Sequence, residues 1–270
     1  MKIALIQMPV VADKKANLEQ AVSRIRDAAC QHIDMAVLPE MFCSPYENSQ
    51  FWHFSEPRGG QVQQAMSALA KELGIYIVAG SLPEAEGEKL YNTSFVYDRT
   101  GAEIACHRKA HLFDIDVVGG QRFQESETLS AGDKATVFDT EFGKLGLCIC
   151  FDLRFQELAM TMGQAGAQAI ICPAAFNMTT GPAHWEVMFR GRAVDNQLYT
   201  IGVAPARDET ASYVSYGNSI AVDPWGTVMC RGGGEAETLV ATLEFEKCSQ
   251  IRQQLPILKA RQTKLYKILN

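Results

Sequence analysis

Short apolar segments recur along the whole chain, and in its first half they alternate with amphipathic segments. Residues 2–8 and 33–38 are apolar and short enough to be buried strands, whereas residues 17–31 carry apolar side chains at helical spacing. The same spacing predicts a second helix over residues 62–73, which Gly74 ends. Strands that alternate with helices pack as a sheet covered by helices, so this pattern predicts an α/β fold.

The rest of the chain places several strands directly after one another. Further strands are predicted over residues 75–81, 91–97, 102–108, 144–150, 169–173, 199–203, 219–222, 227–230 and 238–242. Helices are predicted over residues 155–165 and 185–196, and the segment from residue 246 onward is helical and polar. Because consecutive strands favour antiparallel pairing, the sheets should be mixed rather than purely parallel.

One segment, residues 111–132, shows neither the helical nor the strand period and is predicted to be a long loop. Loops of this length in compact domains are usually functional. A shorter polar turn is predicted at residues 84–89. No linker, low-complexity tract or fixed-period repeat interrupts the sequence, so residues 1–270 are predicted to form a single domain.

The composition excludes several classes of protein. Hydrophobic residues make up 47% and charged residues 21% of the chain, which is typical of a globular protein and not of a disordered, collagen-like or coiled-coil chain. A net charge of -6 argues against a dominant nucleic-acid surface. No apolar run approaches the roughly 18 residues of a membrane helix, and no signal-peptide cleavage site follows the first strand. The chain is therefore expected in the cytoplasm.

The chain contains 8 cysteines but no C-x-x-C pair, so neither a zinc site nor a thioredoxin-type motif is expected. Cys148 and Cys150 are two positions apart, a spacing that suits neither zinc coordination nor an unstrained disulfide. Most of these cysteines should be buried free thiols. The functional question is which of them, if any, is a nucleophile.

Three reactive residues follow apolar strands. Glu40 comes after the strand at 33–38, Lys109 after the strand at 102–108, and Cys150 ends its strand directly before a helical stretch. Ligands in open α/β sheets collect at the carboxyl ends of strands, and a helix N-terminus favours a thiolate. Singly, each residue has a plainer interpretation as a solvated charge or a packed thiol. Together they supply the base, cation and nucleophile that acyl transfer through a thioester requires.

The segments around these residues resemble the signature motifs of the nitrilase, or carbon–nitrogen hydrolase, superfamily. They are LPEMF around Glu40, HRKAHLFD around Lys109 and CICFDLRF around Cys150. The resemblance runs from the first strand to the C-terminal tail. It implies a single-domain αββα sandwich with mixed sheets, and a Glu–Lys–Cys triad that works without a metal or an organic cofactor.

The resemblance also implies a role for each site residue. Glu40 would be the general base, Lys109 the cation that stabilises negative charge, and Cys150 the nucleophile that attacks an amide carbonyl. Glu125 matches the second glutamate of the superfamily and would orient Lys109 or position substrate and water. The backbone N–H of Phe151 would join Lys109 in stabilising the oxyanion.

Within the superfamily, the segments AFN, VDNQ and APARD resemble those of omega-amidases, which hydrolyse the terminal amide of 2-oxoglutaramate and 2-oxosuccinamate. The segment TGPAHWE is shared with deaminated-glutathione amidases, so such an amidase, or another small-amide hydrolase, is the alternative. A substrate carboxylate needs a polar anchor, for which Tyr46, Thr180 and Arg207 are candidates. Asp152 and Arg154 flank the nucleophile and are expected to form an ion pair.

Three rival hypotheses stay open at this point. A Cys–His hydrolase would use Cys150 with His111 or His184. A redox sensor would use Cys148 and Cys150 as its responsive thiols. A binding module would keep the fold without catalysis, although all three members of the triad are present.

The superfamily further suggests a homodimer. The predicted helix at residues 185–196 and the C-terminal tail from about residue 246 are expected at its interface. The expected partners are thus a small-molecule amide and a second copy of the chain, with no nucleic acid and no membrane.

Overall fold

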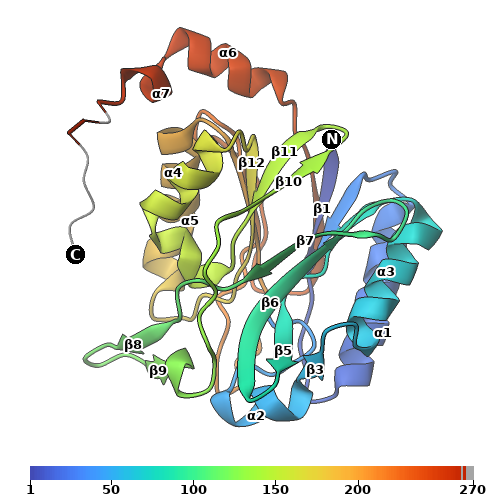
Figure 1. Cartoon of the computed structure of the whole chain (residues 1–270). Coiled ribbons are helices and arrows are strands. Elements are labelled where there is room, and N and C mark those ends of the chain that lie inside the picture. The colour runs from blue at the N-terminus through green and yellow to red at the C-terminus, as the bar shows by residue number, and fades with distance from the viewer. Residues whose placement is uncertain (263, 266–270) are drawn as a thin grey trace.

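Two β-sheets stacked face to face form the centre of the computed structural model, and helices cover their outer faces (Figure 1). The structure describes residues 1–262, 264 and 265. In Figure 1, α1 and α3 cover one sheet and α4 and α5 cover the other. The predicted αββα sandwich with α/β composition is confirmed.

The first sheet has eight strands in the order β16-β1-β2-β4-β6-β5-β3, with β7 paired to β6. Its strands are β1 (Lys2–Gln7), β2 (Met35–Val37), β3 (Glu56–Pro57), β4 (Tyr76–Val78), β5 (Leu82–Glu86), β6 (Lys89–Tyr97), β7 (Glu103–Arg108) and β16 (Glu237–Thr242). The strands β1, β2 and β4 are parallel, whereas β16, β6 and β7 pair antiparallel with their neighbours.

The second sheet has six strands in the order β10-β11-β12-β13-β14-β15. They are β10 (Thr136–Thr140), β11 (Gly143–Leu147), β12 (Ala169–Pro173), β13 (Tyr199–Val203), β14 (Ile220–Val222) and β15 (Val228–Arg231). The three strands β11, β12 and β13 are parallel, and the others pair antiparallel. Both sheets are therefore mixed, as the consecutive strands in the sequence predict.

The start of α1 and the end of α3 follow clear local signals in the sequence. They are α1 (Lys14–Ala29), α2 (Asn48–Phe54), α3 (Gln61–Leu73), α4 (Gln156–Gln164), α5 (Gly181–Asn196), α6 (Glu246–Gln254) and α7 (Ile257–Ala260). The Asp13 side chain caps α1 by accepting from the N–H of Ala16 at 3.0 Å. The predicted stop at Gly74 is confirmed, because this residue adopts a left-handed φ of 63° that glycine tolerates.

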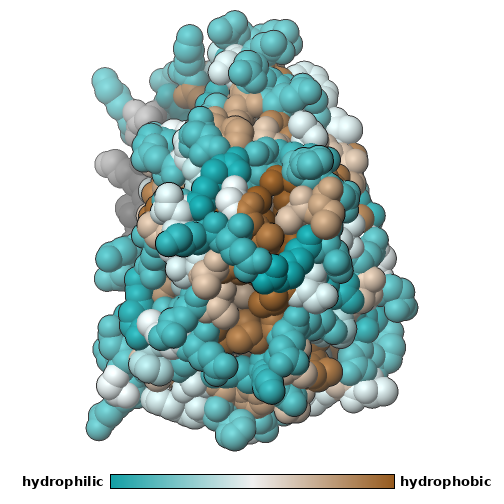
Figure 2. All heavy atoms as spheres, turned by 90° about the vertical axis from the view of Figure 1, so that its right-hand side faces the viewer, coloured by the Kyte–Doolittle hydropathy of each residue, from teal (hydrophilic) through white to brown (hydrophobic). Residues whose placement is uncertain are grey.

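Alternation along the strands builds the layers of the core. In β1, Ile3 and Leu5 pack between the two sheets, whereas Ala4 and Ile6 face α1 and α3. The outer surface over these two helices is mainly hydrophilic, with hydrophobic side chains visible between the polar ones (Figure 2). The layers therefore follow directly from the period of two in the strands.

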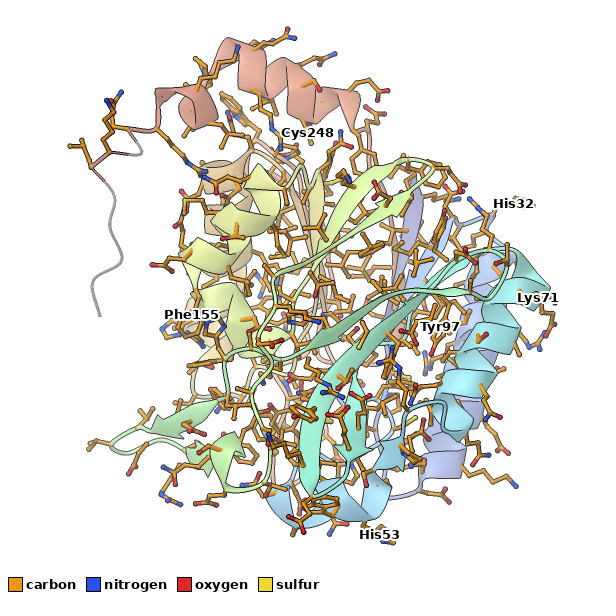
Figure 3. All side chains as sticks on the ribbon, viewed as in Figure 1. His32, His53, Lys71, Tyr97, Phe155 and Cys248 are labelled. Carbon is orange, nitrogen blue, oxygen red and sulfur yellow. The ribbon has the colours of Figure 1, made fainter. Side chains whose placement is uncertain are left out.

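The C-terminal helices lie against one end of the sandwich (Figure 1). Cys248, labelled in Figure 3, points from α6 toward the sheets and its thiol donates to the Gln168 carbonyl at 3.5 Å. Gln197 at the end of α5 donates to the Leu255 carbonyl at 2.6 Å. The described part of the tail therefore packs on its own chain. No helix in that described part of the protein is long and apolar enough to cross a membrane.

Two sequence predictions about loops are wrong. Residues 111–132 contain a short hairpin of β8 (Asp114–Asp116) and β9 (Arg122–Gln124), followed by one 3-10 turn (η1, Glu125–Glu127). Strands of three residues with mixed polarity carry no measurable period, which is why the pattern missed them. The expected turn at 84–89 is mostly strand, because β5 and β6 form a hairpin around a tight turn at Gly87.

Candidate active site

The fold brings Glu40, Lys109 and Glu125 together in one buried cluster. Glu40 follows β2, Lys109 follows β7, and Glu125 begins η1. The Lys109 ammonium donates to Glu40 Oε1 and to Glu125 Oε1, each at 2.9 Å. All three residues have an exposed fraction of 0%. Charged groups are this deeply buried only when they compensate one another, so the cluster acts as one unit.

Glu40 is held by contacts on both carboxylate oxygens. Its Oε1 accepts from Lys109 and from Asn92 Nδ2 at 2.8 Å, and its Oε2 accepts from the N–H of Ala175 at 2.7 Å. Burial raises the pKa of Glu40, and the nearby Glu125 adds to that effect while Lys109 opposes it. A carboxylate with a raised pKa and a fixed orientation is suited to general-base chemistry.

Lys109 stays charged in spite of its burial. Burial lowers the pKa of its ammonium, but the carboxylates of Glu125 and Glu40 outweigh that effect and raise the pKa above its ordinary value. The ammonium also donates to the Tyr46 hydroxyl at 3.2 Å. It is therefore a permanent positive charge at a fixed position.

Cys150 lies on a sharp turn between β11 and α4. Its φ is 46°, a left-handed value that is uncommon for a residue other than glycine, and strain of this kind gathers at functional sites. Burial raises the pKa of its thiol, and the charge of Glu40 raises it further, whereas Lys109 opposes the rise. The thiol and the Glu40 carboxylate are close enough to shift each other's pKa. Attack on a carbonyl therefore requires proton transfer to Glu40.

The expectation of a thiolate at a helix N-terminus is accordingly wrong. The strand β11 ends at Leu147, and a short 3-10 helix of 5 residues (η2, Cys150–Arg154) separates the thiol from α4. The dipole of so short a turn does not offset the loss of hydration and the nearby carboxylate.

Glu125 stands beside Lys109, where the sequence analysis expected it. Its Oε1 accepts from the Tyr46 hydroxyl at 2.6 Å, and its Oε2 accepts from the N–H of Phe113 at 2.7 Å. The Phe151 backbone N–H, next to the nucleophile, donates to no other group in the part of the chain that the structure describes. Such a free N–H is available to a developing oxyanion.

The residues expected to bind the substrate lie in different surroundings. A narrow cavity is lined by Phe113, Cys150, Phe151, Arg154, Ala175, Phe176, Thr180 and Tyr213. Thr180 is thus at the cavity, although its hydroxyl donates to Asn177 Oδ1 at 2.9 Å. Tyr46 lines a neighbouring cavity with Glu40. Arg207 lines neither of these two cavities, and its guanidinium donates to the Tyr216 carbonyl at 2.9 Å.

The expected ion pair between Asp152 and Arg154 is wrong. Asp152 binds His107 and His111 instead. Arg154 has no carboxylate partner among the described residues: Nη1 lies 3.1 Å from His184 Nδ1, and the buried Nε has no hydrogen-bond partner. Burial lowers the pKa of its guanidinium. Arg154 was not predicted as a residue of the cavity, although it lies on the same short turn as the nucleophile.

The geometry of the two histidines does not favour the Cys–His mechanism. The His111 imidazole binds Asp152 and the His184 imidazole binds Arg154, and within the described residues neither is hydrogen-bonded to Cys150. All 8 cysteines are free. No group of three His, Cys, Asp or Glu side chains in the described ranges is arranged to hold a metal ion.

Comparison with known proteins identifies the family of this chain. The model of the carbon–nitrogen hydrolase family matches residues 2–253. The chain is 48% identical to the Mus musculus omega-amidase NIT2 over 267 residues, covering 99% of this chain and 97% of the relative. It is 46% identical to the Homo sapiens omega-amidase NIT2, with the same coverage.

Solved structures agree on the fold. Saccharomyces cerevisiae Nit3, described as a member of branch 10 of the nitrilase superfamily, has a TM-score of 0.89 at 41% identity, covering 98% of this chain and 96% of Nit3. The Caenorhabditis elegans NitFhit protein has a TM-score of 0.90 at 31% identity, covering 98% of this chain and 66% of NitFhit. Since the family model and these relatives span nearly the whole sequence, the chain belongs to the carbon–nitrogen hydrolase family.

Proposed function

We propose that this protein is an omega-amidase that hydrolyses the terminal amide of a small omega-amido 2-oxo acid, such as 2-oxoglutaramate or 2-oxosuccinamate, to the dicarboxylate and ammonia. The observation that carries the proposal is the buried Glu40–Lys109 pair beside Cys150. The identity of 46% or more to the mouse and human omega-amidases supports the choice of substrate class.

Acylation follows from the geometry of the cluster. Glu40 removes the thiol proton as the sulfur of Cys150 attacks the amide carbon, and the carbonyl oxygen takes the negative charge. Lys109 and the Phe151 N–H stabilise this oxyanion, and each donor contributes on the order of a few kcal/mol. Glu40 then gives its proton to the amide nitrogen, the C–N bond breaks, and ammonia leaves a thioester on Cys150.

Deacylation uses the same groups, with water in place of the thiol as the nucleophile. Glu40 removes a proton from water, whose oxygen attacks the thioester carbon, and the two oxyanion donors again stabilise the charge. The C–S bond breaks, the sulfur of Cys150 regains its proton from Glu40, and the carboxylic acid leaves. Because the permanent charge of Lys109 stays in place through both halves, the site needs no rearrangement between them.

We assign recognition of the substrate carboxylate to Arg154 rather than to Arg207. Arg154 lines the same cavity as Cys150, and its guanidinium lacks a carboxylate partner among the described residues. A buried charge without a partner is costly, and a ligand carboxylate supplies a strong bidentate one. Thr180, which lines this cavity too, is the second candidate to contact the ligand.

A substrate panel tests the proposed function. Ammonia release is measured with 2-oxoglutaramate, 2-oxosuccinamate, glutamine, deaminated glutathione and a simple nitrile. We expect the highest kcat/KM for one of the two omega-amido 2-oxo acids. A higher value for deaminated glutathione would replace the substrate while leaving the chemistry intact, and absence of ammonia from every compound would favour a binding module.

The anchor is tested by Arg154→Met, with Arg207→Met as the matched variant. Loss of a charge-assisted hydrogen bond costs about 1.5–3 kcal/mol, so Arg154→Met should lower kcat/KM for 2-oxoglutaramate by roughly 10- to 150-fold. Turnover of the uncharged propionamide should change little. A strong loss in Arg207→Met instead, or equal losses on both substrates in Arg154→Met, would contradict the assignment.

We also propose that the protein acts as a homodimer in the cytoplasm. Val187 and Val194 on α5 and the neighbouring Trp225 are exposed by 62%, 40% and 58%. They line one groove, and a patch of exposed apolar side chains is typical of an interface. Light scattering should give twice the chain mass for the wild type and a smaller mass for Val187→Asp. Cell fractionation tests the compartment.

A further inference from the structure

Asp152 is a buried carboxylate that accepts hydrogen bonds from two separate segments of the chain. Its Oδ2 accepts from the N–H of Ile149 at 3.0 Å and faces His107 Nε2 at 2.9 Å. Its Oδ1 accepts from the N–H groups of Ala110 and His111 at 3.2 and 2.9 Å, and faces His111 Nδ1 at 2.8 Å. One side chain thus has five polar contacts.

These contacts join the two segments that carry the oxyanion donors. Ile149 directly precedes Cys150, and Ala110 directly follows Lys109. The Lys109 segment continues β7 of the first sheet, whereas the nucleophile turn continues β11 of the second sheet. Asp152 therefore links the two sheets of the sandwich at the catalytic centre.

The charge of Asp152 is maintained by its surroundings. Burial raises the pKa of its carboxyl, but the hydrogen bonds from His107 and His111 outweigh burial and lower the pKa below its ordinary value. His107 in turn contacts Thr136 Oγ1 at 2.9 Å, and His111 stacks on Phe155 with ring centroids 3.6 Å apart. Phe155, labelled in Figure 3, lies on the side of the sandwich that carries α4 and α5.

The hydrogen bond to Ile149 also bears on the strained nucleophile turn. Cys150 is held at a φ of 46°, and the carboxylate of Asp152 closes the turn by binding the backbone before it. The Phe151 N–H lies inside this closed turn and is left without an internal acceptor among the described residues. Its position therefore depends on the same carboxylate that fixes the segment of Lys109.

We propose that Asp152 is the positioning residue of the oxyanion hole. Its carboxylate fixes the position of the Phe151 N–H, in the turn after β11, relative to the Lys109 ammonium, in the segment after β7. Asp152 touches neither the substrate nor the reacting atoms in this proposal. It acts only through the two donors, and the proposal holds for any amide that the enzyme hydrolyses, whichever residue anchors the substrate.

The test compares Asp152→Asn with Asp223→Asn. An asparagine at 152 has one acceptor oxygen and one NH₂ group, so it satisfies only one of the two segments. Asp223 is a matched control because it is also buried and its Oδ1 accepts from the N–H groups of Trp225 and Thr227, each at 2.9 Å, in a turn outside both site cavities. Since losing a whole oxyanion donor lowers kcat by roughly 100- to 1000-fold, we expect Asp152→Asn to lower kcat by roughly 30- to 300-fold. KM should change little, and Asp223→Asn should keep a near wild-type kcat.

A second measurement separates positioning from a merely structural role. Methyl methanethiosulfonate reacts with a thiol by displacement at sulfur, so no oxyanion forms. We expect its rate of labelling Cys150, followed by peptide mass spectrometry, to stay within about threefold of wild type in Asp152→Asn. Labelling that falls in parallel with amide turnover would overturn the proposal, and so would a kcat as high as that of Asp223→Asn.

His111→Ala provides the same test if Asp152→Asn does not fold. The His111 side chain is partly exposed, so its removal is tolerable, and it takes away one of the three contacts on Asp152 Oδ1. We expect kcat for the amide to fall several-fold with labelling of Cys150 unchanged. An unchanged kcat, or equal losses in both measurements, would overturn the proposal.

Discussion

Arg108 and Lys109 are neighbours at the end of β7, and each contacts two glutamates, yet one cation is partly exposed and the other is completely buried. Arg108 binds Glu84 and Glu86 at 2.9 Å each and is partly exposed. Lys109 binds Glu40 and Glu125 at the same distance and is completely buried. Adjacent side chains of a strand point to opposite faces. Arg108 therefore joins a partly exposed group of charges, whereas Lys109 supplies a charge to the catalytic site.

The comparison teaches that burial, not the number of ion pairs, gives the Lys109 cluster its chemistry. Arg108 and Glu86 are in contact with water, which screens their charges, so this network contributes little to reactivity. In the interior, burial raises the pKa of Glu40 and makes it a base, while its neighbours keep Lys109 charged. The following substitutions test the two faces of β7 against each other.

The largest difference should separate Glu40→Gln from Glu84→Gln. Both carboxylates are buried, but only Glu40 is placed to exchange protons with Cys150 and water. Loss of a general acid–base typically costs roughly 100- to 10,000-fold in rate, so Glu40→Gln should lower kcat by a factor in that range. Glu84→Gln should leave kcat within a few-fold of wild type.

Steady-state ammonia release measures both variants, and intact-mass analysis shows whether a thioester accumulates on Cys150. Cys148→Ala should still form this adduct, whereas Cys150→Ala should not. An adduct in Cys150→Ala, or full activity in Glu40→Gln, would remove the corresponding residue from the mechanism.

A slightly smaller difference should separate Lys109→Met from Arg108→Met. Methionine keeps most of the length of each side chain and removes the charge. Removing one oxyanion donor costs roughly 100- to 1000-fold in kcat, which is the expected loss in Lys109→Met. Arg108→Met should retain nearly full kcat. If the two variants lose activity equally in folded protein, the oxyanion is stabilised elsewhere.

The two faces of β7 also show how far the sequence could predict the site. The motifs around Glu40, Lys109 and Cys150 predicted the family and the triad through their resemblance to the superfamily motifs, and the strand-end positions alone did not. The surroundings of Asp152 and Arg154 were not predictable in this way. Their partners, His107, His111 and His184, lie between 30 and 45 positions away in the sequence, and only the packing of the two sheets brings them together.

The fold likewise has elements that could be predicted from nearby residues and elements that depend on residues distant in the sequence. Long periodic segments such as α1 and α3 were predicted, since their apolar stripes repeat over several turns. The hairpin of β8 and β9 was not, because each strand has only 3 residues and is defined by its pairing. Likewise, β11 ends at Leu147 although the apolar run continues to Cys150, because strand ends are set by pairing with neighbouring strands.

A change in the pH dependence of kcat/KM is expected to be a smaller effect than these losses of kcat. Glu40 must be deprotonated to act as a base, so activity falls as the pH drops through its pKa. Because that pKa is raised, the acid limb of kcat/KM should lie above the 4.5 of an ordinary glutamate. Lys109→Met removes the cation that opposes the rise and should move the limb to still higher pH. Arg108→Met should leave it in place, and a limb that moves equally in both variants would contradict this account.

The smallest effect should be the loss of stability in Arg108→Met. Glu84 is buried and would keep only the Thr93 hydroxyl at 2.8 Å and the more distant Arg58 at 3.6 Å. Leaving a buried carboxylate less well compensated should lower the free energy of unfolding by about 1–3 kcal/mol, because methionine preserves part of the packing on Tyr91. Urea denaturation measures this loss. In Arg108→Met combined with Glu84→Gln, the loss of unfolding free energy should be smaller, because no uncompensated charge is then buried. An equal or larger loss in the double variant would mean that packing, not charge, holds Arg108 on its face of the strand.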